Sequence, residues 1–147
     1  MAEDYQAAED IKALNRRFIE EVLNKGNLDV VDELIAEDVI DHNPWPGQSP
    51  GSAGVKEQMA MLRNAFPDLR LDIEVEIAEG DLLATVETFT GTHEDMFMGI
   101  PASGTKVSVT GIDVVRVSNG KFTEHWGLFD TAAMMEQLGM MPTVDEG

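Results

Sequence analysis

One acidic residue occupies the apolar face of a predicted strand. Over residues 107–117 every second position is valine or glycine except for Asp113, and alternate residues of a strand point to the same side of a sheet. An ionised carboxylate is costly to bury alone, so this group must pair with a cation, accept hydrogen bonds or keep its proton. Each of these states suits acid–base chemistry, whereas an Asp113 that reaches solvent or is held by a structural partner has no such role.

Polar and aromatic side chains also gather in residues 41–46, where the sequence reads Asp-His-Asn-Pro-Trp-Pro. Loops on a rigid scaffold often carry binding groups, so His42 and Trp45 are candidate substrate contacts. Asn43 precedes a proline, which favours an extended backbone and a fixed direction for its amide. The same residues are common turn formers, and the sequence leaves both interpretations open.

The next candidate is His125, which lies within a predicted strand. An imidazole there can serve as a general base, as a hydrogen-bond donor or as a bonded core residue. The three histidines, His42, His93 and His125, show none of the spacings typical of metal ligands, so we expect no metal site.

The composition narrows the classes of function. The chain has 147 residues, no cysteine, and 28 Asp and Glu against 10 Lys and Arg, a formal net charge of −18. Such a chain repels nucleic-acid backbones and anionic membranes, and its acidic N-terminus and short apolar runs argue against a signal peptide or a membrane span. Phosphate-binding and dinucleotide motifs do not occur. We therefore expect a cytoplasmic protein that needs no cofactor and has no nucleic-acid or membrane partner.

Helical periodicity comes first along the chain and strand alternation follows it. Apolar residues at helical spacing predict helices over residues 4–24, 28–34 and about 52–66, with a short extended segment at 35–42. Alternation and a final helical pattern then predict strands 69–77, 82–92, 107–117 and 121–129 and a last helix, 131–138. In the first of these strands, the face that we expect to be buried carries Leu69, Leu71, Ile73, Val75 and Ile77.

Helices followed by consecutive antiparallel strands indicate an α+β fold, with the helices packed against one face of a curved sheet. We expect one domain over residues 1–147 and a conical pocket between the sheet and the helices. The expected apolar walls of this pocket are Trp45, Met59, Phe97 and Phe129.

The order of the elements and three stretches of sequence resemble the SnoaL-like polyketide cyclases, also called ester cyclases. The stretches are residues 38–44, 98–104 and 111–126, and the likeness spans residues 7–139. These cyclases share a cone-shaped α+β fold with ketosteroid isomerase and the nuclear transport factor family. The resemblance implies cofactor-independent acid–base chemistry on a small hydrophobic carbonyl compound, and a homodimer paired through the outer face of the sheet.

The resemblance also implies roles for individual residues. Asn43 falls on the substrate-orienting asparagine of the cyclases, and Asp113 falls where they carry histidine and the isomerase carries a carboxylic acid that donates a hydrogen bond to an oxyanion. Gly127 replaces the acid/base aspartate of the cyclases, and Gly111 replaces their glutamine. On this basis Asp113 is the expected acid or oxyanion donor, His125 a candidate base and Asn43 an orienting group.

Three hypotheses about function follow. The first is an enzyme, either a cyclase, an isomerase, a dehydratase or a hydrolase, in which Asp113 carries the chemistry. The second is a catalytically silent small-molecule binding module, which Gly111 and Gly127 favour because they enlarge the pocket while removing polar groups. The third is a protein-interaction subunit that uses the outer face of the sheet.

Overall fold

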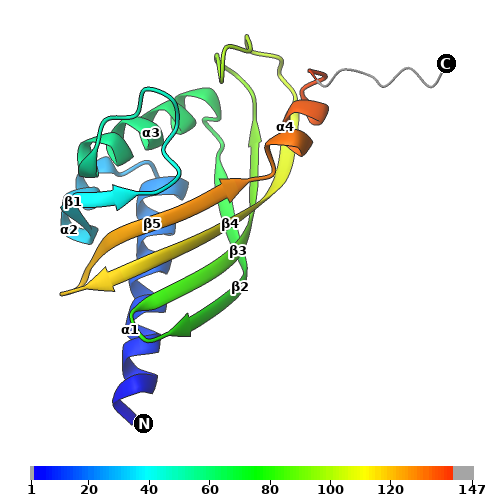
Figure 1. The fold of residues 1–147 in the computed structure, drawn as a ribbon. Helices are drawn as coiled ribbons and strands as arrows, with labels where there is room; N and C mark the ends of the chain where they lie inside the picture. Colours follow the sequence, from blue (N-terminus) through cyan, green and yellow to red (C-terminus); the bar gives the residue numbers. More distant parts are fainter. Residues whose placement is uncertain (1, 141–147) are drawn as a thin grey trace.

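The computed structural model describes residues 2–140, and it describes side-chain surroundings from residue 6 onward. The helices are α1 (Ala2–Phe18), the π-helical η1 (Ile19–Asn24), the 3₁₀ turn η2 (Leu28–Val30), α2 (Val31–Leu34), α3 (Gly51–Ala65) and α4 (Thr131–Gln137). The strands are β1 (Ile35–Asp41), β2 (Arg70–Glu79), β3 (Leu82–Thr92), β4 (Lys106–Ser118) and β5 (Lys121–Phe129). They form one curved sheet in the order β1-β5-β4-β3-β2 that bends around α1 (Figure 1). The predicted α+β class, with a curved sheet wrapped around N-terminal helices, is confirmed.

The N-terminal helix ends where the sequence predicts. Helix α1 continues directly into η1, and Ile11, Ile19 and Val22 along one side are buried. Gly26 follows with a φ of 74°, a left-handed conformation that glycine adopts at little cost after the end of a helix. From Ile11 onward the helix buries its apolar stripe, and Ile19 and Val22 belong to the main apolar cluster of the protein.

Strands β2 to β5 pair with their neighbours in sequence as antiparallel partners, as expected. Asn119 and Gly120, at φ values of 52° and 76°, form the left-handed pair that a tight hairpin between β4 and β5 requires. Strand β1 differs, because it joins the edge of the sheet beside β5 and runs parallel to it. This pairing places Asp41 level with His125 on the neighbouring strand.

The predicted buried face of β2 is wrong beyond Ile73. The pairing with β3 contains a bulge between Ile73 and Val75, and an extra residue in one strand reverses which side chains face the core. Val75 and Ile77 are therefore exposed. Glu76 turns toward α1 instead, where the Arg16 guanidinium donates to its carboxylate over 2.6 Å.

The inner face of the sheet and the helices enclose the apolar core. Phe66 on the end of α3 packs edge to face against Phe89 of β3, with ring centroids 5.2 Å apart, and both rings are fully buried. Toward β1 and the loop that follows it, the core gives way to a cavity of about 720 Å³. Among residues 2–140, no helix has the length and apolar character needed to cross a bilayer.

Candidate active site

The cavity is lined mainly by apolar side chains from the helices and the inner face of the sheet. The four predicted wall residues, Trp45, Met59, Phe97 and Phe129, all lie in this lining. The rings of Trp45 and Phe97 meet edge to face at 5.3 Å, so two loops far apart in sequence contact each other there. The polar groups of the lining include Asn15, Asp41, Asn43, Thr85, Glu87, Asp113 and His125.

His125 lies between two carboxylates. Its Nε2 is 2.6 Å from Oδ1 of Asp113, and its Nδ1 is 3.2 Å from Oδ1 of Asp41. The predicted position of Asp113 on the apolar face of its strand places it in the cavity wall, but its side chain is 29% exposed and so is not shut away from solvent. Of the partners that the sequence allowed for this carboxylate, the structure supplies a cation, the His125 imidazolium.

The two carboxylates fix the charge of the imidazole. Burial opposes protonation of His125, but hydrogen bonds and charge from Asp113 and Asp41 outweigh it and raise its pKa to about 9. Burial likewise opposes ionisation of Asp41, yet the His125 contact and hydrogen bonds from Asn43 and Gln48 lower the pKa of that carboxyl. At neutral pH the site is therefore an imidazolium that donates one N–H to each carboxylate.

Gly127 provides the space for the contact between Asp113 and His125. Asp113 and Gly127 are cross-strand partners on β4 and β5. A Cβ at position 127 would overlap Oδ1 of Asp113 and lie 2.6 Å from Nε2 of His125. An aspartate at this position would therefore exclude the pairing that the structure contains, because the two arrangements occupy the same space.

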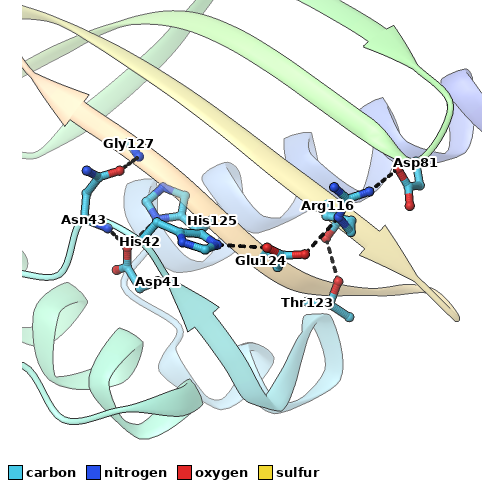
Figure 2. A network of polar contacts seen from close by, with 9 residues as sticks. All are labelled: Asp41, His42, Asn43, Asp81, Arg116, Thr123, Glu124, His125 and Gly127. Atoms are coloured by element: carbon cyan, nitrogen blue, oxygen red, sulfur yellow. Dashed lines mark hydrogen bonds and ion pairs between the residues drawn. The ribbon is translucent and has the colours of Figure 1, made fainter.

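Asn43 lies at the mouth of the cavity with its amide held in one direction. Its Oδ1 accepts a hydrogen bond of 3.0 Å from the backbone N–H of Gly127 (Figure 2). A backbone N–H can only donate, so the oxygen of the amide must face Gly127 and the Nδ2 donor must point elsewhere. This geometry suits a group that donates to a ligand oxygen.

The loop after β1 is tied to the same network through Gln48. The Gln48 Nε2 donates to Oδ2 of Asp41 over 3.1 Å, and its Oε1 accepts from the backbone N–H of Trp45 over 3.0 Å. The backbone N–H of Asn43 also donates to Oδ1 of Asp41, at 3.0 Å. Asp41 thus connects the imidazolium to the loop that forms one side of the mouth.

His42 was predicted to contact substrate, and the structure places it elsewhere. Asp41 faces the cavity, so the next residue points to the outer face of the sheet. There the His42 ring stacks on Trp126, with centroids 4.5 Å apart, and its Nε2 is 2.8 Å from Oε2 of Glu124. His93 is buried at a third location, bonded to Ser103 Oγ over 2.9 Å, so the three histidines do not meet.

Several polar residues of the site were missed from the sequence, among them Asn15 and Gln58 on the helices. Asp41 and Gln48 carried no signal beyond their place in a polar loop. Thr85 and Glu87 lie on β3, whose two faces are similarly apolar in sequence, so alternation did not identify the inner one.

The sequence of this chain matches a known protein family over most of its length. Residues 13–138 match the family model described as SnoaL-like polyketide cyclase. The chain belongs to this family. Membership of the SnoaL-like cyclases confirms the resemblance drawn from the sequence.

Individual SnoaL-like proteins are similar to this chain over nearly its whole length. Aklanonic acid methyl ester cyclase DnrD from Streptomyces peucetius is 28% identical over 140 residues, which cover 91% of this chain and 94% of DnrD. TsrD from Streptomyces laurentii matches with a TM-score of 0.83 at 27% identity and covers 90% of this chain and 97% of its own. IdmH from Streptomyces antibioticus matches with a TM-score of 0.73 at 32% identity, over 91% of this chain and 99% of its own.

Proposed function

We propose that this SnoaL-like protein is a cofactor-independent enzyme that performs acid–base chemistry on a hydrophobic carbonyl compound. One observation carries the proposal: the imidazolium of His125, held between Asp41 and Asp113, lines an apolar cavity large enough for a small organic molecule. A carboxylate that is held in place by a charged partner beside an apolar wall can act as a positioned general base on a bound carbonyl compound. The relative DnrD is a methyl ester cyclase, which favours ring closure as the reaction.

The proton begins on carbon and moves to Asp113. The Asp113 carboxylate removes a proton from the carbon next to the substrate carbonyl, and the electron pair of that C–H bond moves into an enolate. The amide Nδ2 of Asn43 donates to the enolate oxygen. In ring closure the enolate carbon attacks a second carbonyl of the same molecule, and the new alkoxide takes the proton back from Asp113. Atoms and charge balance without a cofactor.

These roles differ from those expected from the sequence, where Asp113 was the acid and His125 the base. Both N–H groups of the imidazolium are used, and the pKa of His125, raised to about 9 against the effect of burial by its two carboxylate partners, keeps it from accepting a proton at neutral pH. Asp41 also accepts hydrogen bonds from Asn43 and Gln48, so we assign the role of base to Asp113. His125 orients it and balances its charge.

A binding module remains the second candidate. The specific observation in its favour is that the imidazolium is saturated by Asp41 and Asp113, as in a structural ion pair. Such a protein would take up the same carbonyl compounds and leave their C–H bonds intact. Proton exchange therefore separates the two functions.

The test uses 4-ethylacetophenone in deuterated buffer, with loss of the acetyl CH₃ signal followed by proton NMR. The enzyme should exchange these hydrogens, while the ethyl hydrogens serve as an internal reference. Asp113→Asn should slow exchange by about 10²- to 10⁴-fold, the usual contribution of a positioned base. The control Asp81→Asn removes a carboxylate that bonds Arg116, away from the cavity, and should leave the rate unchanged. Binding without exchange in the parent protein would reject the enzyme and favour the binding module.

The homodimer expected from the resemblance stays a prediction. Large apolar side chains, among them Ile112 and Leu128, are exposed on the sheet strands β4 and β5. A second copy paired over this face would cover them.

A further inference from the structure

Asn15 is a polar residue in the apolar stripe of the N-terminal helix. It lies between Ile11 and Ile19, each four residues away and buried, and it is itself only 7% exposed. Asparagine is a poor helix former, and its amide is costly to bury without hydrogen bonds. A leucine would suit both the helix and the core at this position. The fold therefore gives no reason for an amide here.

The amide of Asn15 faces the cavity and has no partner in the protein. Asn15 belongs to the cavity lining, and within residues 6–140 its side chain makes no hydrogen bond. In the same part of the chain, the unpaired polar side-chain atoms that are sealed from solvent belong to Glu76, Glu87 and His93. The oxygen and nitrogen of the Asn15 amide are not among them, so they are open to the cavity. Because buried polar groups are normally hydrogen-bonded, a bound molecule is the expected partner.

The strand pairing places this amide at the level of the proposed base. Arg16, the next residue on α1, donates to Glu76 of β2 over 2.6 Å. Glu76 is the cross-strand partner of Thr85, and Thr85 is the partner of Asp113. Two strand spacings, about 10 Å, separate Glu76 from Asp113 along this row. A molecule whose carbonyl lies at Asp113 can therefore reach the helix side of the cavity with a polar group on the far side of a six-membered ring.

The unpaired amide of Asn15 distinguishes between the groups that could meet it. Its Oδ1 accepts hydrogen bonds and its Nδ2 donates them. A hydroxyl suits either atom, because it can donate to the oxygen or accept from the nitrogen, whereas an alkyl group suits neither. A carboxylate would be repelled by the carboxylates of Asp41 and Asp113, which line the same cavity. The favoured ligand group is therefore a neutral hydroxyl.

We propose that Asn15 is a specificity residue that binds a hydroxyl group of the substrate, opposite the carbonyl at Asp113. This inference rests on the proposed function for the position of that carbonyl. Asn15 takes no part in proton transfer. The protein should prefer a molecule with a hydroxyl over one with a methyl group in the same place, because only the hydroxyl gives the buried amide a partner.

Pairs of probes that differ in this one group test the contact by binding alone. 3- and 4-Hydroxyacetophenone are matched by 3- and 4-methylacetophenone, since a hydroxyl and a methyl group have similar volumes. Calorimetric titration in mildly acidic buffer, where the phenols stay neutral, gives the ratio of dissociation constants within each pair. In at least one pair, Asn15→Leu should shift this ratio about five- to tenfold toward the methyl compound, the usual effect of one hydrogen bond. The control Asn64→Leu makes the same change at an exposed site on α3, where Asn64 bonds Asp95, and should leave both ratios unchanged.

Thermal unfolding of Asn15→Leu separates a binding residue from a structural one. Because the amide has no hydrogen bond to lose, the variant should melt about 2 °C or more above the parent protein, since leucine is the better helix former and core residue. A lower melting temperature would show that the fold depends on the amide and would overturn the proposal.

A measurement on the parent protein needs no variant. The side-chain NH₂ resonances of Asn15 should move further on addition of the hydroxyl probe than on addition of its methyl counterpart. Equal movement with both members of each pair, or ratios of dissociation constants that Asn15→Leu does not change, would overturn the hydroxyl contact and leave proton exchange at Asp113 untouched. Failure of the parent protein to bind any of the four probes would reject the carbonyl pocket of the proposed function, and the hydroxyl contact with it.

Discussion

The two faces of the strands β1 and β5 carry two similar networks with different chemistry. Figure 2 shows the outer one, which runs from His42 through Glu124 to Arg116 and Asp81. On the inner face His125 contacts Asp41 and Asp113, and on the outer face His42 contacts Glu124. Each imidazole therefore has a carboxylate within hydrogen-bond distance. Asp41 and His42 are consecutive in the sequence, and so are Glu124 and His125. Consecutive residues of a strand point to opposite faces of the sheet, so one member of each pair lies on each face.

The difference lies in what else surrounds each pair. Glu124 also accepts from Arg116, which bonds Asp81 in turn, so the outer carboxylate has a permanent cation and solvent beside it. The hydrogen bond from His42, aided by Arg116, lowers the pKa of Glu124. On the inner face His125 is the cation for two carboxylates beside an apolar cavity. The same residue types therefore give a solvated ion network on one face and a proton-handling site on the other.

After Asp113→Asn, the largest expected effect comes from filling the space at Gly127. Gly127→Ala places a methyl group where it overlaps Asp113 and crowds His125, so the hydrogen bond between them must break. Exchange of 4-ethylacetophenone hydrogens should fall by about 10²-fold or more. The same NMR assay measures this change.

Gly91→Ala is the matched control for Gly127→Ala. It adds a methyl group 3.0 Å from Phe66 in the core, away from the Asp113 contact, and should lower thermal stability without the loss of exchange. Equal losses in the two variants would show that crowding of a strand, and not the His125 contact, limits the reaction.

The second effect concerns the dependence of stability on pH. Burial works against the charged imidazole, but Asp113 and Asp41 raise the pKa of His125 from 6.5 to about 9 in the folded protein. This gain in stability is fully present below the unfolded value and is lost as pH rises through the folded one, with a magnitude of up to about 3 kcal/mol. Urea unfolding at intervals between about pH 6 and pH 9.5 should show the decline. His125→Gln should remove most of this slope, and a slope that persists in His125→Gln would assign it to other groups.

The smallest effect is expected on the outer face. His42→Ala removes one hydrogen bond to Glu124 and one ring stacked on Trp126, which together contribute about 1 kcal/mol. The exchange rate should stay within about twofold of the parent, because these contacts lie on the opposite face of the sheet from the cavity. A loss of exchange comparable to that of Gly127→Ala would mean that the two faces are coupled through β5.

Local sequence patterns were sufficient to predict the helices, the antiparallel strands and the inward position of Asp113, because each of these depends on the spacing of nearby residues. They did not determine that β1 runs beside β5, since parallel pairing joins residues 84 positions apart, as between Asp41 and His125. The side of the sheet that His42 occupies follows from that pairing. The position of Glu87 was also beyond reach, because both faces of β3 are similarly apolar and only the helices decide which one is inner.

The link between Gln48 and Asp41 has a mechanical consequence. Gln48 holds the backbone of Trp45 with one end of its amide and the carboxylate beside His125 with the other. If the loop after β1 moves outward to admit a bulky substrate, either the two hydrogen bonds of Gln48 break or the Asp41 carboxylate moves with the loop. Substrate entry is therefore coupled to the orientation of the His125 imidazole, which is bonded to Asp41.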